Sequence, residues 1–166
     1  MFKKGNFILY ETIGVCQVNE ISRTDFSGNN QLYYYLIPRF EKNMTIYIPV
    51  DSDKVTMREI LSRQEAESFV LSWPAVKCKK YSNDRERAQV YKQVIKSGNC
   101  LELASMIKEI VQIEQSCKGR GKMLPLREKD GVKTARKLLF GELATALEIG
   151  PEEVPDYILR QTGCLC

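Results

Sequence analysis

The chain has 166 residues, of which 43% are hydrophobic and 28% are charged, and its formal net charge is +4. This composition is typical of a globular protein of one or two domains and excludes an intrinsically disordered chain. No apolar run approaches the roughly 20 residues of a membrane span, and the N-terminal stretch MFKKGNFILYETIG has no signal-peptide core or cleavage site. We therefore expect a cytoplasmic protein without membrane association.

The absence of histidine narrows the possible functions further. It excludes Ser-His-Asp and Cys-His catalysis, a histidine general base and every zinc site that uses imidazole. No acidic pair stands beside a glycine-rich loop, so paired-carboxylate or phosphate chemistry has no recognisable site. We expect the protein not to be an enzyme and to hold no cofactor or metal.

The six cysteines are scattered and include no CxxC pair, in a chain long enough to fold without disulfides. We expect reduced thiols, most of them buried. An enzyme that uses a cysteine thiolate stays open as an alternative, and only Cys78 and Cys117 have cations nearby to lower a thiol pKa. The cysteines are Cys16, Cys78, Cys100, Cys117, Cys164 and Cys166.

The first 50 residues predict short β-strands. Runs rich in Ile, Val, Tyr and Phe are separated by turn residues at 27–30 and 41–43. Gly14 within a strand run indicates a bulge or sharp bend. Four or five strands in so short a span predict a compact, strongly bent barrel. The expected strands lie within residues 6–10, 13–22, 31–40 and 44–50.

From residue 61 the hydrophobic period becomes helical. Ser62 and Glu65 form a capping box, and Asn83 and Glu86 repeat the pattern three residues apart. The predicted fold is therefore α+β, with a β domain at residues 1–60 and a bundle of about five helices at residues 61–166. After the helix that Ser62 caps, the expected helices cover residues 84–96, 101–117, 131–147 and 151–161.

Charge is distributed unequally between the two halves. Residues 1–60 hold seven cations and seven anions, so residues 61–166 carry the whole net charge. Within that half, residues 77–96 hold seven cations against two anions, and residues 118–137 hold eight against two. Such segregation indicates an electrostatic footprint for nucleic acid, although a charge run can also be an ordinary solvated helix face.

Several segments carry a family resemblance that runs through nearly the whole chain. They are KGNFILYETIGVCQV, YYYLIP, MTIYIPVDS and MREILS, followed by RERAQVYKQVIKSGNCLELASMIKEIV and KMLPLREKDGVKTARKLLFGELATAL. In this order and spacing they resemble the CarD/CdnL family of bacterial transcription regulators. The resemblance implies a Tudor-like or SH3-like β domain, shared with transcription-repair coupling factors, joined to a helical domain. No helicase motif is present, which excludes a coupling factor itself.

The resemblance also implies the partners. The β domain is expected to dock on the RNA polymerase β subunit, while the helical domain contacts promoter DNA at the upstream edge of the bubble and stabilises the open complex. An exposed edge strand can pair with a partner strand, and aromatic and arginine side chains dominate interface energetics. The residues expected to bind polymerase are Arg23, Asp25, Phe26, Thr45 and Tyr47.

The expected DNA contacts lie in the two basic segments. Cations that reach phosphates bind with little sequence preference and with strong salt dependence. The family commonly has a Trp wedge before its R-x-x-Y helix, and the nearest aromatic at that place here is Tyr81; Trp73 lies several residues earlier and is interpreted as core or domain-junction filler. The expected DNA-binding residues are Lys79, Lys80, Tyr81, Arg85, Arg87, Lys118, Arg120 and Lys122.

A net charge of +4 is mild, so we expect weak affinity for free DNA, with polymerase tethering supplying the effective concentration. We also expect a monomer. An alternative from another class is a stand-alone RNA-binding protein with a Tudor/SH3-like domain and helices. That alternative predicts stacking of aromatic side chains on single strands and no contact with polymerase.

Overall fold

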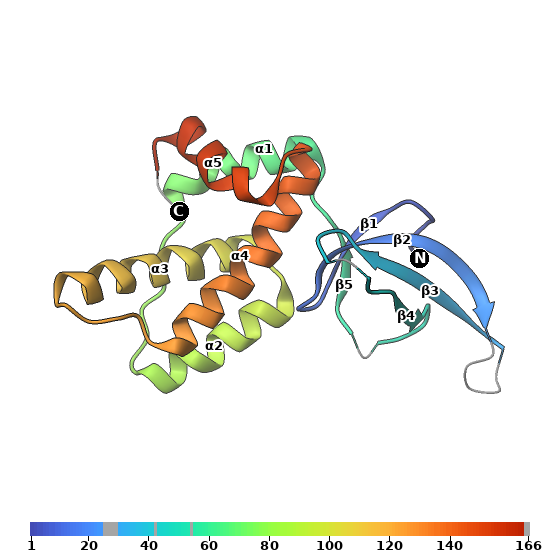
Figure 1. The fold of residues 1–166 in the computed structure, drawn as a ribbon, viewed down its shortest axis with the longest axis horizontal. Coiled ribbons are helices and arrows are strands. Elements are labelled where there is room, and N and C mark those ends of the chain that lie inside the picture. The colour runs from blue at the N-terminus through green and yellow to red at the C-terminus, as the bar shows by residue number, and fades with distance from the viewer. Residues whose placement is uncertain (25–29, 42, 54, 165–166) are drawn as a thin grey trace. The chain divides into compact units, whose positions relative to one another are not determined.

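The computed structural model describes residues 1–24, 30–41, 43–53 and 55–164, and its fold is drawn in Figure 1. The chain divides into two compact units, Met1–Ile60 and Leu61–Cys166. An antiparallel sheet forms the first unit and helices form the second, which confirms the predicted α+β class.

The sheet has five strands in the order β4-β3-β2-β1-β5, and neighbouring strands are antiparallel. Strand β2 is long and changes register between Val18 and Glu20, where a bulge bends it. Among the described residues, β4 and β5 stand at the two edges, so the sheet is open rather than closed. The strands are β1 (Phe7–Tyr10), β2 (Gly14–Thr24), β3 (Gln31–Pro38), β4 (Ile46–Pro49) and β5 (Met57–Glu59).

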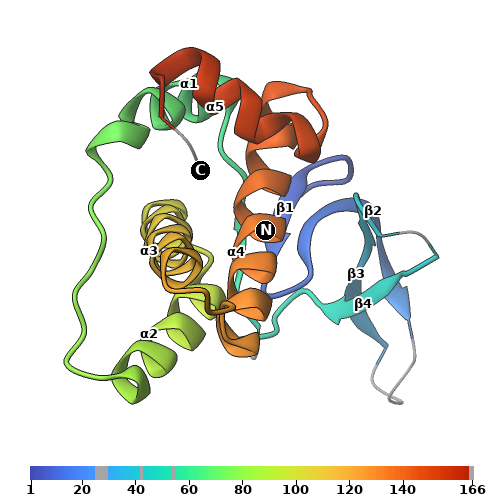
Figure 2. The ribbon, with the colours of Figure 1, turned by 60° about the vertical axis from the view of Figure 1, so that its left-hand side comes forward.

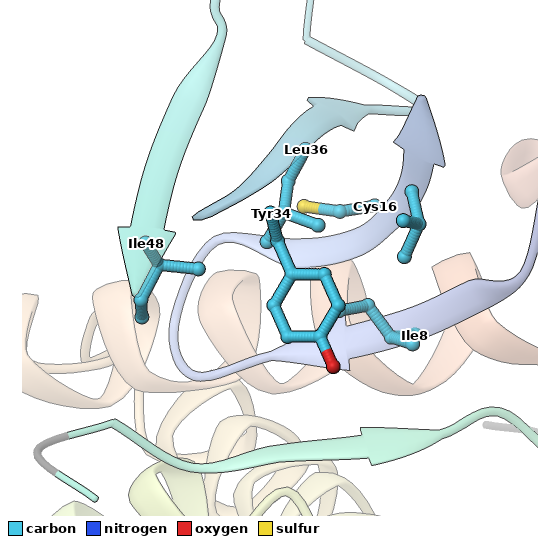
Figure 3. Packing of buried hydrophobic residues seen from close by; sticks show 6 residues of the cluster. Ile8, Cys16, Tyr34, Leu36 and Ile48 are labelled. Atoms are coloured by element: carbon cyan, nitrogen blue, oxygen red, sulfur yellow. The ribbon is translucent and has the colours of Figure 1, made fainter. Parts of the chain in front are cut away.

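One face of this sheet carries the core of the β unit. Because side chains alternate along a strand, Tyr34 and Leu36 point to the same face, where Ile8, Cys16 and Ile48 join them. Figure 3 shows these five side chains converging. The polar end of Tyr34 is satisfied, because its hydroxyl accepts a hydrogen bond of 2.9 Å from the backbone N–H of Phe2.

The second unit contains five α-helices within the described residues, and each short 3-10 helix precedes or follows one of them. Helices α3 and α4 pack against each other, and Leu103 and Ile107 of α3 and Leu139 of α4 are fully buried. The helical elements are α1 (Arg63–Ser72), η1 (Trp73–Ala75), α2 (Asp84–Ser97), α3 (Cys100–Gly119), α4 (Leu126–Leu147), η2 (Pro151–Glu153) and α5 (Val154–Thr162).

The helix ends follow the predicted signals. Ser62 and Glu65 form the expected capping box at α1. Asn83 caps α2, its side chain accepting from the N–H of Glu86 at 2.9 Å. Helix α2 ends at Gly98, whose φ of 61° is the left-handed conformation that glycine adopts without strain.

Helix α4 begins at Leu126, five residues before the predicted start at residue 131. Gly131 therefore lies inside the helix and does not open it. A Cβ atom at this position would stand 3.1 Å from Cε of Met106, so the glycine allows α4 to approach α3 closely. The extra turn matters for the site, because it brings Glu128 beside α2.

Trp73 is fully buried within the helical unit, with its ring edge-on to Phe69 at a centroid distance of 6.3 Å. This burial supports its interpretation as core filler. The expectation of mostly buried cysteines was wrong: of the five described cysteines, only Cys16 is buried. In the part of the chain that the structure describes, no helix is long and apolar enough to span a membrane.

Candidate nucleic-acid and polymerase interfaces

The segment between η1 and α2 carries the first group of cations, and α3 holds it in place. Ser105 Oγ donates a hydrogen bond of 2.8 Å to the backbone carbonyl of Lys77. Lys108 Nζ donates to the carbonyls of Trp73 and Val76, each at 2.9 Å. In Figure 1 this segment runs past α3 before it turns into α2. Its backbone is therefore fixed by side chains of a buried helix, although the segment itself has no regular structure.

Three of the predicted cations on and after this segment are presented at the surface. Lys79 is exposed but pairs with Glu102, with 3.1 Å between Nζ and Oε1. Such an exposed pair is weak and can exchange for a phosphate. Lys80 and Arg85 are exposed.

Arg87 is different from Arg85, two residues earlier on the same helix. Its Nη2 lies 2.9 Å from Oε1 of Glu128 and 3.1 Å from Oδ1 of Asp84. Only 20% of the Arg87 side chain and 8% of the Glu128 side chain are exposed. The guanidinium is therefore engaged in joining α2 to α4. We withdraw Arg87 from the expected DNA contacts, because a phosphate would have to compete with a buried carboxylate.

Tyr81 is also engaged within the protein. Its ring stands edge-on to Tyr91, with 6.0 Å between centroids. Burial, and then the neighbouring Glu109 carboxylate, raise the pKa of Tyr81 to about 12. Burial likewise raises the pKa of Glu109, while the hydroxyl of Tyr91, the Arg87 charge and the hydroxyl of Tyr81 oppose that rise. A ring held in this cluster is poorly placed to act as a wedge between bases.

The last turn of α3 and the loop that follows it carry the second group of cations. Lys118 pairs with Glu114 one helical turn earlier, with 3.0 Å between Nζ and Oε1. Arg120 donates from Nη2 to the Ser116 hydroxyl at 2.9 Å. Lys122 is exposed. All three predicted cations of this group thus remain at the surface, and their contacts are local ones within the same turn.

One cation from each basic segment, Arg85 and Arg127, lines a groove between α2 and α4. The groove has a volume of about 730 Å³. Its lining includes the cations Arg85, Lys92 and Arg127, the ring of Tyr91, and the carboxylates of Asp84 and Asp130. Figure 2 shows α4 beginning beside α2. Sequence reasoning noted Arg127 among the cations of its segment but did not select it. Its position among the eight cations of residues 118–137 is the sequence signal that points to it.

On the β unit, Tyr47 occupies the edge strand β4 and lies outside the core. Its side chain is 49% exposed, and its ring stands edge-on to that of Tyr35, with 4.8 Å between centroids. Tyr35 is its direct partner across the strand pair. Thr45 is exposed just before β4. The edge strand and the two rings form a surface of the kind that strand addition uses.

Arg23 does not join this surface. It pairs with Leu32 on β3, three positions from Tyr35, and alternation along β3 then places it on the opposite face from Tyr47. Its guanidinium donates to the carbonyl of Asn30 at 3.2 Å. The other two predicted polymerase contacts, Asp25 and Phe26, lie outside the described residues. The described part of the chain contains no cluster of three or more potential metal ligands.

Each of the two units matches a model of a known protein family. Residues 2–61 match the model described as the CarD-like/TRCF RID domain, and residues 70–159 match the CarD C-terminal domain. A comparison with curated proteins gives no match. A chain with these two domains in this order is a regulator of transcription that interacts with RNA polymerase and belongs to a class without enzymatic activity. The chain is a member of the CarD family.

Proposed function

We propose that the β unit docks on the RNA polymerase β subunit and that the helical unit contacts promoter DNA near the upstream edge of the bubble, stabilising the open complex. The observation that carries this proposal is that the basic segments 77–85 and 118–127 each place one cation, Arg85 and Arg127, at the same groove of a unit that the family attaches to a polymerase-interacting domain.

For docking, the supporting feature is the edge of β4. An edge strand offers N–H and C=O groups to a partner strand, and an exposed aromatic side chain can anchor the contact. Tyr47 and Tyr35 supply such an anchor, because the two rings pack edge-on and hold the exposed Tyr47 ring in place. Arg23 is on the other face of the sheet and is dropped from this contact.

For DNA, the supporting feature is a set of exposed cations held on a rigid backbone. Lys80, Arg85 and Lys122 are exposed, and Arg127 reaches the same groove as Arg85. Contacts to phosphates of this kind position a protein without reading bases, so the effect should be similar across promoters. A monomer suffices for such binding.

The test uses the purified chain and its two units, each of which has its own buried core. The full chain and residues 1–60 should be retained on immobilised β subunit, and residues 61–166 should not. Full retention by the helical unit alone would refute the docking half of the proposal. Open complexes challenged with a competitor polyanion should dissociate more slowly when the full chain is present. Unchanged lifetimes would refute the other half.

The same experiment separates this function from stand-alone RNA binding. An RNA-binding protein would retain single-stranded RNA through stacked aromatic side chains and would not be retained by the β subunit. Among the described aromatic residues of the helical unit, Tyr81 packs on Tyr91 and Trp73 is buried, which leaves few rings for stacking.

A further inference from the structure

Two large apolar side chains project where the connection from α3 enters α4: Met123 lies in the connection and Leu126 is the first residue of α4. Met123 is 79% exposed and Leu126 is 73% exposed, and among the described residues only Met1 is a more exposed large apolar residue. Leu124, between them, is buried and anchors the chain to the helical unit. Pro125 follows with its φ fixed near −57°. The connection and the start of α4 thus present Met123 and Leu126 to solvent from a fixed backbone.

The surroundings of these side chains are strongly positive. Residues 118–127 contain four cations, all exposed, and no anion; Lys118 pairs with Glu114 one helical turn earlier, and the other three have no carboxylate within the segment. The next residue, Glu128, is buried against Arg87 and does not offset that charge at the surface. A partner for this surface must satisfy two conditions. It must carry negative groups that pair with the cations, and it must offer apolar surface that covers the two exposed apolar side chains. The four cations are Lys118, Arg120, Lys122 and Arg127.

Duplex DNA at a disrupted base step has these two properties. Phosphates flank the step, and the separated base pairs expose apolar faces between which proteins insert side chains such as Met and Leu. A membrane surface is a poorer fit, because two apolar side chains without an amphipathic helix bury too little area for stable binding. Single-stranded RNA would favour aromatic side chains, and this loop has none.

We propose that Met123 and Leu126 form an apolar wedge that inserts at an unstacked base step while the neighbouring cations hold the flanking phosphates. The inference rests on DNA contact by the helical unit and deepens it. Tyr81 cannot take this role without leaving Tyr91, whereas the two exposed side chains have no such packing to break. The loop lies next to the groove that holds Arg85 and Arg127, so wedge and cations can act on one duplex.

The experiment measures binding of the full-length chain to two short duplexes at low salt. One is fully paired, and the other carries a two-base-pair mismatch next to 2-aminopurine, whose fluorescence rises on unstacking. We expect the parent chain to prefer the mismatched duplex by roughly tenfold, because the mismatch removes much of the unstacking cost. The double variant Met123→Ser with Leu126→Ser should lose that preference and the fluorescence rise.

Both replaced side chains are exposed, so folding should be preserved. Affinity for the paired duplex and its salt dependence should stay unchanged, since the phosphate contacts remain. The matched control is Leu71→Ser with Leu101→Ser, two exposed leucines of the same unit outside the basic loop, which should behave as the parent. Loss of preference in this control would overturn the assignment, because it would make the effect a general one of surface apolarity.

Three further results would overturn the wedge. The first is that the parent chain binds the mismatched and the paired duplex equally well. The second is that the serine variant still prefers the mismatched duplex. The third is that the serine variant keeps this preference but loses binding to phosphatidylserine vesicles. The outcome is separable from that of the proposed function. A chain that fails to bind polymerase but shows the wedge preference supports the wedge and refutes docking. A serine variant that loses neither DNA preference nor open-complex stabilisation overturns the wedge and leaves the proposed function standing.

Discussion

Arg85 and Arg87 provide the sharpest contrast between a functional and a structural cation. Both were expected to contact DNA, but Arg87 lies 2.9 Å from a buried carboxylate of Glu128, whereas Arg85 is exposed. Replacing Arg87 by Ala leaves Glu128 buried without its cation. Breaking a fully buried pair costs about 3–5 kcal/mol. Because Arg87 is one-fifth exposed, water can partly replace it, and we expect about 2–3 kcal/mol.

In a unit of this size, that loss corresponds to a fall of about 10–15 °C in the melting temperature. Arg85→Ala is the matched control on the same helix and should leave the melting temperature unchanged. Thermal unfolding followed by circular dichroism measures both variants. In the transcription assay, Arg85→Ala should shorten open-complex lifetime below that of the parent at a temperature where both are folded.

The double variant Arg87→Ala with Glu128→Ala completes the cycle. It should be no less stable than Arg87→Ala alone, because the uncompensated carboxylate is gone. An Arg87→Ala variant that melts with the parent but shortens open-complex lifetime would refute this reasoning. Such a result would return Arg87 to the DNA interface.

Three further predictions concern single side chains. Trp73→Ala should cost about 3 kcal/mol of stability, and its effect on open complexes should follow unfolding alone, as denaturant titration beside the lifetime assay would show. Tyr47→Ala should weaken binding to the β subunit by about 1–2 kcal/mol with an unchanged melting temperature; a large fall in the melt would instead assign Tyr47 to the fold. The pKa of Glu109 is raised, so the folded state loses stability as pH rises through the range in which this carboxyl ionises. Glu109→Gln should therefore gain stability relative to the parent from pH 4 to pH 8, and a gain that stays constant across that range would contradict the burial argument.

The sequence predicted those strands and helices whose signals lie within their own residues or at their ends. The apolar run at residues 31–40 and the caps at Ser62 and Asn83 indicated where strands and helices lie, and the structure agrees closely. Strand β5 was not predicted, because Met57–Glu59 is short and has no apolar run. The start of α4 was misplaced because Gly131 suggests a helix boundary in isolation. Position 131 holds a glycine because Met106 of α3 approaches it closely, and this tertiary contact cannot be read from the sequence.

For the candidate site, charge identified the right segments but not the role of each side chain. Residues two apart on a helix project to nearly opposite sides, so Arg87 can face α4 while Arg85 faces solvent. Only the placement of Glu128 decides which of the two is buried. Similarly, strand alternation separates Arg23 from Tyr47, but only the pairing register across β2, β3 and β4 reveals this.

The proposed function requires that the exposed cations of the two basic segments, among them Arg85 at the groove between α2 and α4, hold promoter DNA in the open complex. Its most direct test compares the triple variant Lys80→Ala, Arg85→Ala and Lys122→Ala with a triple variant of equal charge loss, Arg63→Ala, Lys96→Ala and Arg160→Ala. The quantity measured is the lifetime of polymerase–promoter open complexes at low and at high salt, with polymerase binding checked for each protein.

We predict that the first variant loses most of the parent's stabilisation at low salt and differs less from the parent at high salt, where screening already weakens phosphate contacts. The control should match the parent at both salts, and all three proteins should bind polymerase equally. If the first variant stabilises open complexes as well as the parent does at low salt, the two basic segments are a solvated surface and the account is wrong.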